Sequence, residues 1–280
     1  MILKPLQIST KLRHFAMISL LAACGGAVDP VSDLESRTPE EIYRLAEGLL
    51  EQGNAVRAGS TFGEIERLYP YSEWAKRAMM MSAFSYHTAG DYELSRSAAQ
   101  RYLDFFPADD DAAYAQFLVA LSHYDRIVDV GRDQGTTFEA LQALGATIER
   151  YPNSEYAASA RLKFDLALNH LAGQEMEIGR YYLKRGHYTA AINRFRAVVE
   201  EYQTTSHTAE ALHRLVEAYL SLGLADEAQT AGAILGHNFQ GSDWYENSYA
   251  LLTGEGLDAA EAGDSWLTSI YRQVVQGKWL

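Results

Sequence analysis

The chain has 280 residues and a formal net charge of −13, with 37 acidic side chains against 24 lysines and arginines. This charge argues against a nucleic-acid-binding protein, which needs a basic surface. A single cysteine excludes a disulfide within the chain and a cysteine-based zinc site.

The N-terminal segment has the layout of a secretory signal peptide. Lys4, Lys11 and Arg13 form a basic region without acidic residues, and the apolar run FAMISLLAA follows it. That run is too short to span a bilayer as a mature helix. The segment ends in LAAC, which resembles the lipobox of bacterial lipoproteins and implies cleavage of residues 1–23 and lipid on Cys24. The other interpretation, a cytosolic protein with a buried core cysteine, leaves the basic and apolar segment unexplained.

The lipobox also implies the kind of anchor and its membrane. The expected groups on Cys24 are an S-linked diacylglycerol and an N-acyl chain, which together hold a protein far more firmly than one chain does. The next residue is Gly25 rather than aspartate, and by analogy with lipoprotein sorting this favours the outer membrane. No hydrophobic periodicity follows before Arg37, so we expect residues 24–37 to form a lipidated, flexible tether.

The central part of the chain repeats itself. Five segments align without gaps, and each has a small residue five positions and an aromatic sixteen positions after its first glycine. These glycines are Gly53, Gly90, Gly135, Gly186 and Gly223. We expect each glycine to end one helix in the left-handed conformation, and the next residues to form a second helix. The small residue then marks the place where the two helices touch closely.

The signals that start and stop helices agree with this pattern. Thr38, Pro39 and Glu41 form a capping box with proline at the first helical position. A helix–turn–helix unit of about 34 residues is typical of tetratricopeptide (TPR) repeats. Repeat starts are 37 residues apart at both ends but 45 and 51 apart in the middle, where we expect longer helices or insertions. The predicted fold is all-α, an α-solenoid of about five TPR-type repeats over residues 38–252.

The tail over residues 253–280 has an apolar stripe of its own. The stripe consists of Trp266, Leu267, Ile270, Tyr271, Val274 and Val275. We interpret it as a short helix that caps the last repeat. The other interpretation is a helix that docks on a partner.

No catalytic or metal-binding pattern occurs. The eight histidines include no pair four residues apart, and the chain has no nucleophile-elbow or Walker A sequence. The string GEGLDAA from Gly254 matches a dinucleotide fingerprint in letters only, because no βαβ unit surrounds it. We therefore expect a non-enzymatic binding protein with no metal and no cofactor other than the lipid on Cys24.

Several stretches go beyond a generic TPR repeat. The run LAGQEMEIGRYYLKRGHYTAAINRFRAVVEEYQTT (171–205) is the most specific, and ERYPNSEYAASA (149–160) and LGHNFQGSDWYENSYALL (235–252) add to it. Together they resemble the BamD family, the TPR lipoproteins of the machinery (BAM) that folds β-barrel proteins into the outer membrane. The resemblance covers roughly residues 21–252 and stops before the tail.

The resemblance implies a body that faces the periplasm and docks on the periplasmic domains of BamA, beside other BAM subunits. In the family the BamA contact lies toward the C-terminal repeats, which implies Tyr181, Tyr182 and Arg194 here. Arg194 stands between Ile192 and Phe195, so we expect it on the helix flank, free to pair with a partner's carboxylate. The other interpretation is a solvated surface arginine.

The resemblance also implies contact between the N-terminal repeats and unfolded outer-membrane β-barrel proteins. The C-terminal signals of those proteins end in aromatic and apolar residues, so their groove should offer aromatics and hydrogen-bond donors. The candidates are Tyr43, Arg44, Arg67 and Tyr86. For Tyr43 and Tyr86 the other interpretation is packing between helices.

A second functional hypothesis stays open at this point. A periplasmic TPR lipoprotein that serves as a scaffold for peptidoglycan or cell-division proteins has the same lipobox and repeats, but it does not account for the run over 171–205. An enzyme fused to the repeats has no room, since the repeats fill the chain from about residue 40 to 240.

Overall fold

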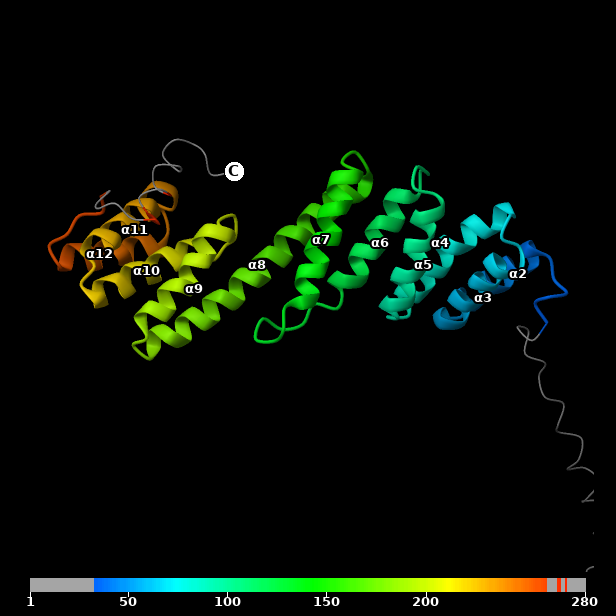
Figure 1. Ribbon diagram of the computed structural model, residues 1–280, viewed down its shortest axis with the longest axis horizontal. Helices are drawn as coiled ribbons and strands as arrows, with labels where there is room; N and C mark the ends of the chain where they lie inside the picture. Colours follow the sequence, from blue (N-terminus) through cyan, green and yellow to red (C-terminus); the bar gives the residue numbers. More distant parts are fainter. Residues whose placement is uncertain (1–32, 261–265, 268–269, 271–280) are drawn as a thin grey trace, which may run out of the picture.

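The computed structural model describes residues 33–260, 266, 267 and 270. In this part of the chain the regular structure is helical, with eleven α-helices (α2–α12) and no strand. Figure 1 shows an elongated array in which helix pairs follow one another along the long axis from α2 to α12. The predicted all-α solenoid is confirmed. The predicted signal peptide over 1–23, Cys24 and most of the predicted tether lie outside the described residues, as do Tyr271, Val274 and Val275.

Each repeat is one pair of helices. The first helices are α2 (Pro39–Glu51), α4 (Glu73–Thr88), α6 (Ala112–Tyr124), α8 (Glu155–Lys184) and α10 (Thr208–Leu222). The second helices are α3 (Ala55–Leu68), α5 (Tyr92–Phe105), α7 (Gly135–Arg150), α9 (Tyr188–Glu201) and α11 (Ala225–Asn238). A final helix, α12 (Asp243–Gly254), packs against α10 and α11 and covers the fifth pair.

Side chains before the first helical residue satisfy free backbone groups at several helix starts. The predicted capping box at α2 forms: the Thr38 hydroxyl accepts from the N–H of Glu41, and the Glu41 carboxylate accepts from the N–H of Thr38 at 2.9 Å. The bond from the Thr38 N–H, together with one that the Thr38 hydroxyl donates to the same carboxylate, lowers the pKa of the Glu41 carboxyl. Ser72 and Ser242 cap α4 and α12 with their hydroxyl groups.

Glycine ends the first helix in four of the five pairs, as predicted. The φ angles lie between 73° and 80° at Gly53, Gly90, Gly186 and Gly223. This left-handed conformation is less favourable for any residue that has a Cβ than for glycine. The prediction is wrong for Gly135, which begins α7 rather than ending α6. α6 already ends at Tyr124, so the turn is made by a longer loop instead.

The uneven spacing of the middle repeats has two structural sources. One is the loop over residues 125–134, between α6 and α7. Gln134 is buried, and its side-chain amide donates to three backbone carbonyls of this loop, at Asp129, Val130 and Arg132. The other source is α8, which is 30 residues long. Its first half packs against α6 and α7, and its second half packs against α9 and α10. The expected insertions and longer helices are therefore both present.

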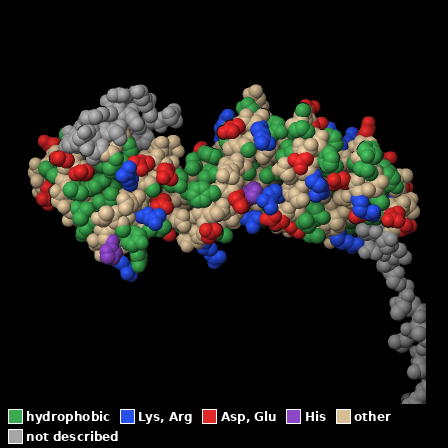
Figure 2. Space-filling model, viewed as in Figure 1, with side chains coloured by type: hydrophobic (Ala, Val, Ile, Leu, Met, Phe, Trp, Pro, Cys, Tyr) green, Lys and Arg blue, Asp and Glu red, His purple; other side chains and the backbone are tan. Residues whose placement is uncertain are grey.

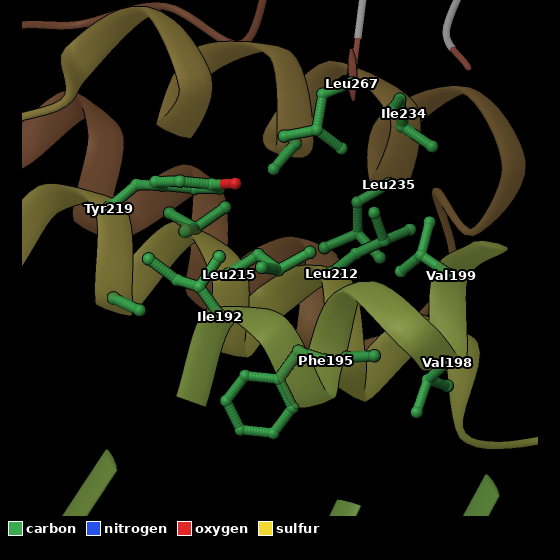
Figure 3. Close-up of a cluster of buried hydrophobic side chains, with 14 of the residues drawn as sticks. Ile192, Phe195, Val198, Val199, Leu212, Leu215, Tyr219, Ile234, Leu235 and Leu267 are labelled. Atoms are coloured by element: carbon green, nitrogen blue, oxygen red, sulfur yellow. The ribbon is translucent and has the colours of Figure 1, made fainter. Parts of the chain in front are cut away.

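The five small residues of the repeats lie inside the array. All five are fully buried: Ala58, Ser95, Ala140, Ala191 and Ala228. The five repeated aromatics follow the last residues of the second helices and pack, partly buried, against the core: Tyr69, Phe106, Tyr151, Tyr202 and Phe239. Figure 3 shows the cluster of the last two repeats, in which α9, α10 and α11 contribute side chains together with Leu267.

One glycine of α8 provides a test of how tightly the pairs pack. A Cβ on Gly179 would stand 2.4 Å from the Phe195 ring of α9. Gly179→Ala is therefore expected to lower the free energy of unfolding by about 1–3 kcal/mol, because the ring must move within a filled core. Urea titration followed by circular dichroism measures the change.

The matched control is Gly145→Ala on α7. Its Cβ would lie 3.7 Å from the Phe164 ring, an ordinary contact, and replacing a helical glycine by alanine gains about 0.5–1 kcal/mol. If both variants were as stable as the wild type or more so, the Phe195 ring would not be confined as the structure shows.

Candidate partner-binding surfaces

The first candidate surface is a groove between repeats 1 and 2, at the place where α3 ends, α4 begins and α5 ends. We call it the repeat 1–2 groove, and its volume is about 900 Å³. Its lining residues are Gly63, Glu66, Arg67, Pro70, Tyr71, Ser72, Glu73, Lys76, Met79, Arg101, Phe105 and Phe106.

Two aromatic side chains of this groove are turned to solvent. Tyr71, in the turn between α3 and α4, is fully exposed, and Phe105 at the end of α5 is 64% exposed. Phe106 beside it is half-buried and packs against the core. Exposed aromatic rings beside an apolar floor provide contact area for a partner at little cost in conformational entropy.

The basic side chains of the groove are held by carboxylates. Lys76 forms an ion pair with Asp109, and its ammonium lies 5.8 Å from the centroid of the Phe106 ring. Tyr102 donates to the same Asp109 at 2.6 Å, and these two partners lower the pKa of the Asp109 carboxyl. Arg101 pairs with Glu66 of α3 at 3.2 Å. The groove thus presents positive groups in fixed positions.

Two of the four predicted substrate residues are packing residues. The Tyr43 ring lies 5.0 Å, centroid to centroid, from both Phe62 and Trp74, which places it between α2, α3 and α4. Tyr86 of α4 lies against α3, where a Cβ on Gly59 would stand 3.0 Å from its ring. Burial raises the pKa of both phenols. The alternative considered from the sequence describes these two side chains better than a partner contact does.

The two predicted arginines have different surroundings. Arg44 is exposed and pairs with Glu40 one turn earlier, at 2.5 Å, away from the groove. Arg67 lines the repeat 1–2 groove, and its Nε donates to Glu64 at 2.8 Å. Of the predicted substrate residues, Arg67 is therefore the one that the structure places in the groove.

Sequence reasoning missed the two exposed aromatics, although the repeats contain a signal for them. Tyr71 follows the proline after the first repeated aromatic, where the next two repeats have Ala108 and Asn153. Phe105 precedes the repeated aromatic of the second repeat, where the first has Leu68. An aromatic at a position that the repeat does not require is a candidate for function rather than for packing.

The second candidate surface is formed by α8 and α9. The Nη1 atom of Arg194 donates to both carboxylate oxygens of Glu175, at 3.2 and 3.1 Å. The prediction that Arg194 is free for a partner is wrong in this respect, because α8 places Glu175 opposite it. The two residues line a hollow of about 460 Å³ together with Tyr182 and Tyr202. The Arg194 side chain stays 43% exposed, so the pair can be reached from outside.

The two predicted tyrosines of α8 are neighbours whose side chains differ in burial. Tyr181 is 51% exposed, and the Arg185 guanidinium lies 4.5 Å from the centroid of its ring. Tyr182 is half-buried and packs against the core of the last two repeats. Tyr181 therefore belongs to the outer surface, while Tyr182 forms part of the wall of the hollow beside Arg194.

A metal site and a membrane-spanning helix are both absent from the described part of the chain. It contains no group of three or more histidine, cysteine or acidic side chains that could hold a metal ion. None of its helices combines the length and apolar character needed to cross a bilayer. On the face in Figure 2 basic and acidic side chains are interspersed, with no basic strip of the kind that binds nucleic acid.

Comparison with known proteins identifies the family. The profile described as "YfiO: Outer membrane lipoprotein" matches residues 35–234. A protein of Caulobacter vibrioides, named outer membrane protein assembly factor BamD, is 46% identical over 241 residues, or 86% of this chain and 79% of that protein. A protein of the same name from Rickettsia prowazekii is 43% identical over 211 residues, 75% of this chain and 84% of that protein. The chain therefore belongs to the BamD family of outer membrane protein assembly factors.

Proposed function

We propose that the chain is a non-catalytic scaffold and receptor of the BAM machinery, held at the periplasmic face of the outer membrane by lipid on Cys24. It binds the C-terminal signals of unfolded β-barrel proteins and the periplasmic domains of BamA, and so brings substrate and insertion machinery together. The repeat 1–2 groove carries this proposal, because Tyr71 and Phe105 expose aromatic rings that the fold does not need.

The chemistry of the groove suits the end of an unfolded β-barrel strand. Such a segment presents an aromatic residue, alternating apolar side chains and a terminal carboxylate. Tyr71 and Phe105 offer rings to the aromatic residue. Arg101 and Lys76 lie at the same groove and are already paired with Glu66 and Asp109, so their remaining N–H groups offer hydrogen bonds to the terminal carboxylate.

The surface of α8 and α9 suits BamA. Arg194 uses Nη1 for both bonds to Glu175, so the remaining guanidinium N–H groups can donate to a partner's carboxylate. Glu175 fixes the direction in which they point. Tyr181 extends this surface along α8 with an exposed ring, and aromatic and arginine side chains are the residues that most often dominate protein interfaces.

Co-purification of the tagged protein from detergent-solubilised outer membranes tests the proposed function directly. Near-stoichiometric recovery of the β-barrel subunit with periplasmic domains, identified by mass spectrometry, supports it. Recovery of peptidoglycan or cell-division proteins in its place would support the other scaffold function.

Globomycin, which blocks lipoprotein signal processing, should leave the protein as a longer precursor if Cys24 is lipidated.

The groove makes a prediction for substrate binding. Tyr71→Ala combined with Phe105→Ala is expected to weaken binding of a synthetic C-terminal β-barrel peptide by about tenfold or more, because two exposed contact rings are lost. Fluorescence anisotropy measures the affinity. Phe138→Ala, which removes an exposed ring of α7 outside the groove, is the control and should bind as the wild type does. If the double variant bound the peptide as tightly as the control does, the repeat 1–2 groove would not be the substrate-binding site.

The Arg194 surface makes a prediction for BamA. Arg194→Ala is expected to weaken association with the periplasmic domains of BamA by about tenfold or more. Helical circular dichroism should stay unchanged, because the side chain is half-exposed. Arg161→Ala removes an exposed arginine from the first half of α8 and serves as the control. Surface plasmon resonance measures the affinity of both variants for the periplasmic domains of BamA. An unaltered affinity of the Arg194→Ala variant contradicts the assignment.

A further inference from the structure

Repeats 1 and 2 have close counterparts in repeats 4 and 5. The turn glycines Gly53 and Gly90 correspond to Gly186 and Gly223, an offset of 133 residues in both cases. With the same offset, the bounds of α3 coincide with those of α9, and the bounds of α5 with those of α11. Each position of the repeat 1–2 groove therefore has a defined counterpart between repeats 4 and 5.

The counterpart groove is filled. Gly63, Met79 and Arg101 of the repeat 1–2 groove correspond to Arg196, Leu212 and Ile234. Arg196 lies over Trp266, with 4.7 Å from its guanidinium carbon to the ring centroid. Leu267 is fully buried in the same cluster as Leu212 and Ile234. Figure 3 shows Leu267 above Leu212, between Tyr219 and Ile234.

Several contacts hold Trp266 in this groove. The indole Nε1 donates to the hydroxyl of Tyr219 at 3.1 Å. Tyr219 corresponds by the same offset to Tyr86 of α4, which does not line the repeat 1–2 groove. A hydrogen-bond acceptor, a guanidinium over the ring face and an apolar floor thus act together on one aromatic–aliphatic pair.

The segment that fills the groove is an addition to the repeat array. It follows the five helix pairs and α12 along the chain. α12 already covers the last pair: its Leu252 is fully buried, and its Ser248 is hydrogen-bonded to His213 of α10 at 2.8 Å. After α12 the chain turns at Gly256, which has φ 74°, and passes Gln229 of α11, which donates to the carbonyl of Asp258. It then places Trp266 and Leu267 on α9, α10 and α11.

We propose that the groove between repeats 4 and 5, which we call the repeat 4–5 groove, is a second segment-binding site, closed within the chain by Trp266 and Leu267. It accepts a partner segment that presents a tryptophan beside an aliphatic residue, in exchange for the chain's own pair. Lys76 and Arg101 are replaced here by Ala209 and Ile234. The preferred segment therefore needs no terminal carboxylate, unlike that of the repeat 1–2 groove, and this inference goes beyond the proposed function.

Because Trp266 and Leu267 belong to the same chain as the groove, any outside ligand must compete with them for it. A segment joined to its own site by a short linker acts at an effective concentration in the millimolar range. An external segment with the same contacts must compete with this concentration, so its apparent affinity falls by the corresponding factor. The repeat 4–5 groove is then open only to a partner that is itself held nearby.

The test uses the full chain carrying Trp266→Ala and Leu267→Ala, with a fluorescent peptide GDSWLTSIYR (residues 263–272) as the probe. The double variant is expected to bind this peptide at least about tenfold more tightly than the wild type, because the competing pair is gone. Any binding at the repeat 1–2 groove occurs in both proteins, so the difference reports the repeat 4–5 groove.

Two controls locate the site. Arg196→Ala, added to the double variant, removes the guanidinium over the ring and should weaken the peptide again. A peptide with alanine in place of its tryptophan and leucine should not bind. Equal binding of the probe to the wild type and to a double variant of native helical content overturns the proposal. If the double variant loses helix, Trp266→Ala alone answers the same question, and a single variant that binds no more tightly than the wild type overturns the proposal as well.

Discussion

The structure depends on close packing between neighbouring helices, at buried side chains no larger than serine. Ala58, Ser95, Ala140, Ala191 and Ala228 are all fully buried. The contact lets neighbouring side chains such as Phe62 and Phe195 fill the space between helices. One pair alone cannot cover its apolar face, so each repeat takes its stability from the next, and α12 covers the last of them.

The repeat spacing predicted the architecture because local rules and packing agree in most of the chain. Capping residues, left-handed glycines and buried small residues all lie where the sequence places them. Gly135 is the exception, since its turn is made earlier by the loop over residues 125–134. That loop is held by a buried amide, that of Gln134, which donates to three carbonyls. Such a set of contacts has no periodicity, so the repeat pattern could not indicate it.

The candidate surfaces were less predictable than the fold, because the repeat pattern says which face a residue occupies but not what lies opposite. Tyr43 was assigned to substrate, yet its ring packs between helices. Arg194 was expected on a helix flank and is there, but Glu175 of the neighbouring helix meets it. Tyr71 and Phe105 break the repeat pattern rather than follow it. Positions where a repeat carries more than packing requires are the better guide to function.

The long α8 has a further consequence for how the two halves of the molecule are arranged. In Figure 1 this helix runs from the first three repeats to the last two. Its 30 residues contain no proline and span about 45 Å. Because a helix turns by about 100° per residue, its length sets the rotation of the repeat 1–2 groove relative to the surface around Arg194, as well as their separation. α8 therefore sets both the distance and the rotation between the two halves, and adding or deleting one residue would re-orient one half against the other.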